Sequence, residues 1–117
     1  MESRIAEYRR ATGVAWNDES IAATLRGFET RAAALLRGEP VQLGVAMGSC
    51  QCGDVAATLT MRDGIVWCQS RGREGWQRYD GPASGCRVAY GLGRTAQAIA
   101  AMVEGTPLPA GVYHASC

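Results

Sequence analysis

The dipeptide Asp63-Gly64 constrains the fold of this chain more than any other feature of its sequence. It separates two runs, residues 54–62 and 65–71, in which apolar and polar residues alternate. Two-residue loops of this composition join antiparallel strands, because both residues tolerate the positive φ of a type I′ turn. The turn also predicts the register: residue 62 faces 65, 61 faces 66, 60 faces 67 and 59 faces 68.

This register divides the side chains of the hairpin between two faces of a sheet. One face is apolar and is predicted to join the core: Val55, Ala57, Leu59, Met61, Val66 and Cys68. The other face is mostly polar: Thr58, Thr60, Arg62, Ile65, Trp67 and Gln69. Trp67 is therefore expected to point outward or toward a second layer, while Cys68 serves as a small hydrophobic residue.

Two helices are predicted before the strands. Residues 2–12 can form a short helix that ends at Gly13, and a longer helix is expected to begin at Asn17 and to stop at Gly38. Apolar residues of the longer helix recur at steps of four and three, as in one stripe that faces a core: Ile21, Leu25, Phe28, Ala32 and Leu35. Gly27 lies inside this helix, which suggests that another backbone approaches closely there.

The remaining elements complete an α+β pattern. Alternation from Val41 to Met47 predicts a strand, and two more strands are expected at residues 76–80 and 86–90. Residues 95–104 are expected to form an amphipathic helix. The predicted fold therefore has N-terminal helices, an antiparallel sheet of four or five strands, and one further helix packed on the sheet. At 117 residues the chain has the size of one domain, residues 1–117.

Composition excludes several classes of function. The formal net charge is +1, which gives no general attraction to nucleic acid or to anionic membranes. All 12 basic residues are Arg, so Schiff-base and Walker-A lysine chemistry are excluded, and a GC-rich bacterial or phage genome is indicated. We find no signal peptide and no apolar stretch of the roughly 20 residues that a membrane span needs, so a cytoplasmic protein with five reduced cysteines is expected.

The segment Cys50-Gln51-Cys52 is a candidate metal site, because two thiolates one residue apart can share a soft metal. Zinc would need two more ligands, taken from Cys68, Cys86, His114 and Cys117. A redox pair and inert thiols are the other interpretations.

Residues 48–55 resemble the opening zinc-binding segment of the glutathione-dependent formaldehyde-activating family. That family has a further Cys-x-Cys-x-x-Cys segment, which this sequence lacks, so nothing is carried over and no cofactor is predicted, with zinc as the alternative.

A cluster of arginine and aromatic residues is a candidate ligand site. Arg71, Arg73, Trp76 and Arg78 follow the hairpin strand that carries Trp67. Guanidinium groups beside aromatic rings suit a phosphate-bearing or nucleobase ligand. The alternative is a turn whose Trp fills a second layer or a dimer contact while the arginines are solvated.

Residues 91–96, Gly-Leu-Gly-Arg-Thr-Ala, have the residue types of a dinucleotide-binding motif. The motif also needs a second parallel strand after the helix, and the remaining sequence is too short to form one. Free backbone N–H groups and Arg94 at the expected helix start could still hold an anion, or Thr95 could simply cap the helix. Acid–base catalysis is poorly supported, because His114 is the one histidine and no pair of carboxylates stands out.

These observations favour a non-enzymatic binding or regulatory module, expected to be a homodimer, that recognises a partner protein or a small anionic ligand. Nucleic acid is a less favoured partner. The alternatives are a metal-binding or redox protein that uses Cys50 and Cys52, and a small Cys/His enzyme. The residues predicted to bind the ligand are Trp67, Arg71, Arg73, Trp76, Arg78 and Arg94.

Overall fold

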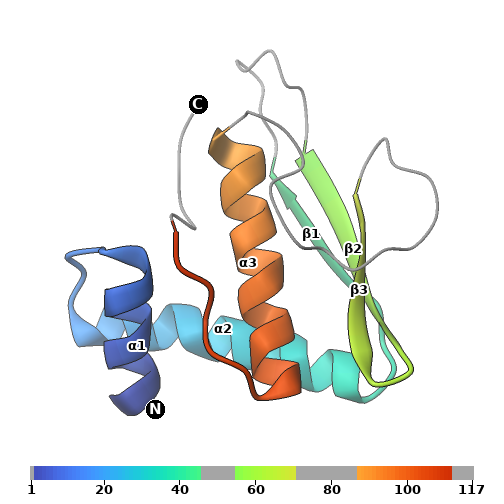
Figure 1. The fold of residues 1–117 in the computed structure, drawn as a ribbon, viewed down its shortest axis with the longest axis horizontal. Helices are drawn as coiled ribbons and strands as arrows, with labels where there is room; N and C mark the ends of the chain where they lie inside the picture. Colours follow the sequence, from blue (N-terminus) through green and yellow to red (C-terminus); the bar gives the residue numbers. More distant parts are fainter. Residues whose placement is uncertain (1, 46–54, 71–86, 112–117) are drawn as a thin grey trace.

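A computed structural model describes residues 2–45, 55–70 and 87–111 of the chain. Its elements are α1 (Glu2–Thr12), α2 (Asp18–Leu36), β1 (Val41–Val45), β2 (Val55–Arg62), β3 (Ile65–Ser70) and α3 (Arg87–Glu104). The strands form an antiparallel sheet in the order β1-β2-β3, and α2 and α3 pack against it (Figure 1). The predicted α+β class is confirmed. The described residues contain three strands, fewer than the four or five expected.

The hairpin has the predicted turn and register. Asp63 and Gly64 both have positive φ, 53° and 76°, as a type I′ turn requires. Leu59 pairs with Cys68 and Thr60 pairs with Trp67. The inner face of the sheet, the face toward the helices, carries the buried residues Val41, Leu43, Leu59, Val66 and Cys68.

The two N-terminal helices begin and end where the sequence predicts. The side chain of Asn17 accepts a hydrogen bond from the amide of Ser20 at 2.8 Å, which caps α2. At the other end Gly38 has a φ of 84°, and its N–H donates to the carbonyl of Leu35. The predicted stripe of α2 is buried throughout: Ile21, Leu25, Phe28, Ala32 and Leu35.

The expectation for Gly27 is wrong. A Cβ built at this position would meet the Arg31 guanidinium at 3.3 Å and no other backbone. Arg31 is exposed, and its guanidinium donates to the Gly27 carbonyl from the next turn of the same helix. The glycine is therefore not required by close packing.

The predicted strand at residues 86–90 and the predicted helix start at Thr95 are also wrong, because α3 begins at Arg87 and continues to Glu104. Gly91 and Gly93 suggest a turn, yet each costs a helix only about 1 kcal/mol relative to Ala. Burial of Ala96, Ala98 and Ile99 against the rest of the core offsets this cost. The expected strand at 76–80 lies outside the described residues.

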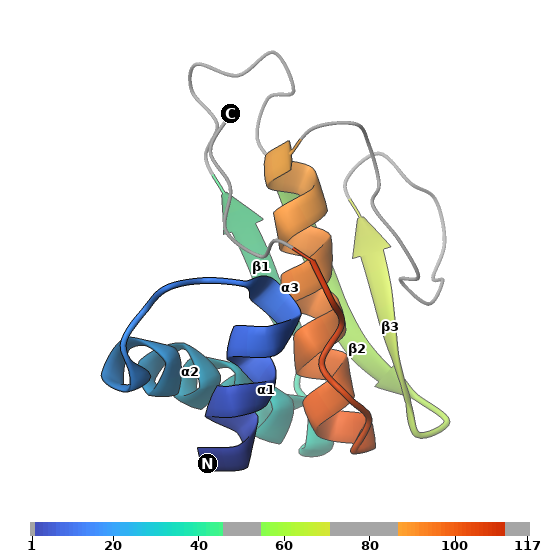
Figure 2. The same cartoon turned by 60° about the vertical axis from the view of Figure 1, so that its left-hand side comes forward.

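The segment after α3 turns back along the helix (Figures 1 and 2). Gly105 has a φ of 71°, and the amide of Thr106 donates to the carbonyl of Ala101. Farther on, the amide of Gly111 donates to the carbonyl of Ala11, so this segment is tied to α1. Within the described part of the chain, no helix combines the length and the apolar character needed to cross a membrane.

Candidate functional site on the outer face of the sheet

The face of the sheet that points away from α2 and α3 is the candidate site. We call it the outer face and define it by the described side chains that lie on it: Thr58, Thr60, Arg62, Ile65 and Trp67. Figure 2 shows α3 lying across the opposite face. Among the described elements, none covers the outer face.

Arg62 and Trp67 interact on this face. The guanidinium carbon of Arg62 lies 5.6 Å from the centroid of the Trp67 ring, within the range of a cation–π contact. The two residues occupy diagonal positions of the hairpin, because Trp67 pairs with Thr60 and Arg62 pairs with Ile65. This contact places the guanidinium over the indole ring.

Three polar groups at or near this contact have no hydrogen-bond or ion-pair partner among the described residues. The indole Nε1 of Trp67 is buried and has no hydrogen-bond partner within the described residues. Arg62 is exposed and forms no ion pair with any residue that the structure describes, and the same is true of Asp63 in the adjacent turn. The hairpin tip thus carries one positive and one negative charge, each open to a partner.

The outer face also exposes apolar surface. Ile65 is 37% exposed, and Trp67 is partly buried beside it on the same strand. Contiguous exposed apolar area is typical of contact surfaces, and these two side chains are neighbours on one face. The site therefore combines an apolar strip along β3 with charges at the hairpin tip.

The structure places the sequence-predicted residues in three different settings. Trp67 points away from the core, as expected. Arg94 lies within α3, on the other side of the sheet, where its guanidinium donates to Gln97 Oε1 at 2.6 Å. The two residues are not brought together, and Arg94 lies inside α3 and not at its start. The remaining predicted ligand residues lie outside the described residues: Arg71, Arg73, Trp76 and Arg78.

Arg62 was not among the predicted site residues. The hairpin register could have identified it, since that register already placed positions 62 and 67 on one face. The sequence evidence for Arg62 as a site residue is weak, because a single exposed arginine on a strand is most often only solvated.

The candidate metal ligands are mostly outside the described residues, including Cys50 and Cys52. Cys68 is described, and it is 2% exposed on the inner face, as expected for a small hydrophobic residue. Where the structure describes the chain, no group of three His, Cys, Asp or Glu side chains is placed to hold a metal ion. Zinc binding by Cys50 and Cys52 stays a prediction.

The chemistry of the outer face suits binding. Its described side chains offer apolar area, two threonine hydroxyl groups and a guanidinium, with no carboxylate and histidine couple among them. Comparisons of the chain with protein-family models, with curated proteins and with solved structures find no match.

Proposed function

We propose that this chain is a non-enzymatic protein-interaction module whose recognition surface is the outer face of the sheet. The observation that supports the proposal is the Arg62–Trp67 contact on a sheet face that no described helix covers. Trp and Arg are the residues that most often carry the binding energy of protein interfaces. Arg71, Arg73, Trp76, Arg78 and Arg94 remain predicted ligand residues, although Arg94 lies in α3 on the other side of the sheet.

A second copy of the chain is the partner that fits this face best. Arg62 and Asp63 are adjacent, oppositely charged and exposed, and neither has an ion pair among the described residues. A two-fold contact makes such a pair self-complementary, because each Arg62 then faces an Asp63 of the second copy. A partner of another sequence would have to supply both charges separately.

In the proposed contact, the two hairpins stack face to face. A two-fold axis parallel to β2 and β3 lays β2 of one copy over β3 of the other, with sheets about 10 Å apart. Trp67 then covers Thr60 of the second copy, and Ile65 covers the aliphatic part of Arg62 there, as the cross-strand pairs of one hairpin predict. The apolar strip is buried while the charges pair at its end.

Sedimentation equilibrium over a range of concentrations tests this proposal. The wild-type chain should self-associate, and both Arg62→Glu and Asp63→Arg should weaken association, because each places like charges opposite one another. The combination Arg62→Glu/Asp63→Arg should restore it. Arg26→Glu, the same charge change at an exposed position of α2, is the matched control and should leave association unchanged.

A monomeric wild-type chain at all concentrations would reject the second copy as the partner. The sequence also predicted a small anionic ligand as the partner. Titration of the monomer with inorganic phosphate and with ATP tests this alternative, and the indole resonance of Trp67 reports binding. Saturable shifts that Arg62→Glu abolishes would assign the face to an anionic ligand instead.

A further inference from the structure

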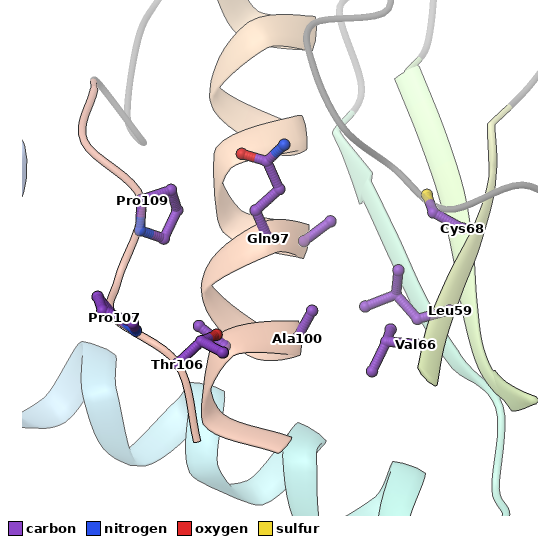
Figure 3. Close-up of a pocket in the computed structure, with 10 residues that line it drawn as sticks. Leu59, Val66, Cys68, Gln97, Ala100, Thr106, Pro107 and Pro109 are labelled. Carbon is purple, nitrogen blue, oxygen red and sulfur yellow. The ribbon is translucent and has the colours of Figure 1, made fainter. Parts of the chain in front are cut away.

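A cavity of about 270 Å³ lies on the opposite side of the sheet from the outer face (Figure 3). Three parts of the chain form it: the inner face of β2 and β3, the middle of α3, and the segment after α3. Leu59, Val66 and Cys68 line the first part, and Thr106, Pro107 and Pro109 belong to the last. The cavity is thus walled by segments that are far apart in the sequence.

Small side chains on α3 leave this space open. Ala96, Ala100 and Ala101 line the cavity from the helix. Figure 3 shows Ala100 facing Leu59 and Val66 from across the cavity. An alanine extends only one carbon beyond the backbone, so these residues leave space beside the helix. A larger residue at position 100 would occupy the cavity.

The wall formed by residues 106–109 is fixed by bonds to α1. The amide of Leu108 donates to Glu7 Oε2 at 2.7 Å, and Leu108 itself is buried. Arg4 pairs with Glu7 at 2.8 Å and also contacts the carbonyl of Thr106. Pro107 and Pro109 restrict the backbone on either side of Leu108. This wall is therefore preformed, which lowers the entropic cost of binding a ligand against it.

The side-chain amide of Gln97 provides a hydrogen-bond donor on the lining that has no partner among the described residues. Gln97 lines the cavity, and its Oε1 accepts a hydrogen bond from Arg94. That bond fixes the orientation of the amide and leaves Nε2 as the remaining donor. Nε2 makes no hydrogen bond with any residue that the structure describes. A ligand that presents an acceptor oxygen to Gln97 would satisfy this group.

We infer that this cavity binds a compact, mostly apolar molecule with one acceptor oxygen, such as an aryl ketone. The space is open to solvent on one side, and its volume of about 270 Å³ has room for roughly ten non-hydrogen atoms, since benzene fills a closed cavity of about 150 Å³. In this proposal the ring contacts alanine and proline side chains of the lining, and Gln97 Nε2 donates to the carbonyl oxygen. The inference is independent of the proposed self-association, because the cavity and the outer face are on opposite sides of the sheet.

Titration of isotope-labelled full-length protein with acetophenone, and in parallel with ethylbenzene, tests this inference. Both compounds should give saturable shifts in the amide resonances of α3, and acetophenone should bind more tightly. Gln97→Met should weaken acetophenone binding by roughly fivefold, the effect of one net hydrogen bond, and should leave ethylbenzene binding nearly unchanged. Thr30→Ala on the exposed side of α2 is the control and should alter neither.

Ala100→Leu should abolish the binding of both compounds, because the added carbons occupy the cavity. The absence of saturable binding to the wild-type chain would overturn the inference, and so would undiminished binding to a folded Ala100→Leu protein. If Ala100→Leu does not fold, the Gln97→Met variant tests the inference by itself. Equal losses of affinity for acetophenone and ethylbenzene would then contradict the role assigned to Nε2.

Discussion

The carboxylate of Glu7 in α1 accepts a hydrogen bond from the backbone amide of Leu108, which lies 101 residues away in the sequence. This bond joins the two ends of the described chain and holds the segment after α3 against α1. Burial alone would raise the pKa of Glu7. The Leu108 amide, Arg4 and Arg10 together outweigh that effect, so the pKa is held below its ordinary value of 4.5.

A lowered pKa in the folded state predicts how stability depends on pH. The bonds to the Glu7 carboxylate contribute fully above the ordinary pKa of 4.5 and are lost as pH falls through the lower folded value. Glu7→Gln should therefore lower the free energy of unfolding by about 1–2 kcal/mol at neutral pH and by less in acid. Urea unfolding at several pH values measures this, with the exposed Glu29→Gln as control. An equal loss at every pH would contradict the account.

The cap at the start of α2 predicts a second effect on stability. Asn17→Ala removes the acceptor for the Ser20 amide and should cost about 1 kcal/mol, whereas Asn17→Asp keeps an acceptor and adds a negative charge at the helix N-terminus. Chemical denaturation of the two variants compares them directly. Equal stability of Asn17→Ala and the wild-type chain would mean that the cap contributes nothing.

Gly27→Ala should stabilise the protein by about 0.5–1 kcal/mol, because alanine lowers the entropic cost of helix formation. The added Cβ would meet the Arg31 guanidinium at 3.3 Å, and this exposed group can move aside. Thermal unfolding monitored by circular dichroism provides the measurement. A fall in stability would show that the helix has no room for the methyl group and would contradict the packing described for α2.

Ala100→Leu should also affect the stability of the unliganded protein. Filling the cavity buries additional apolar area without displacing a neighbour, so the free energy of unfolding should rise or stay within about 0.5 kcal/mol of the wild-type value. Denaturant unfolding of the unliganded variant tests this expectation. A loss of about 2 kcal/mol or more would indicate overpacking and a smaller space between α3 and the sheet.

Local signals predicted much of this fold. The Asp63-Gly64 turn, the Asn17 cap and the Gly38 end of α2 each depend on residues within one or two turns of chain, and the structure confirms all three. The start of α3 was missed because Gly91 and Gly93 resemble a turn when considered alone. The sequence does contain a helical spacing through this region: Val88, Leu92, Ala96, Ile99 and Val103.

The parts of the candidate sites that depend on distant contacts could not be predicted. The register placed Trp67 and Arg62 on one face, but nothing local shows whether a helix covers that face. The cavity requires three alanines of α3, the inner face of the hairpin and a terminal segment held by Glu7. Its donor, Gln97 Nε2, depends in turn on the Arg94 contact, which a predicted helix start at Thr95 obscured.

The contact between two outer faces can be observed directly. In an equimolar mixture of isotope-labelled and unlabelled chains, an isotope-filtered NOE experiment detects only contacts between copies. The proposed contact predicts a filtered NOE between the Trp67 ring of one copy and the Thr60 methyl group of the other, and the loss of this NOE in Arg62→Glu. A sample that is dimeric by sedimentation yet shows filtered NOEs only to α1 or α2 would contradict the proposed recognition surface.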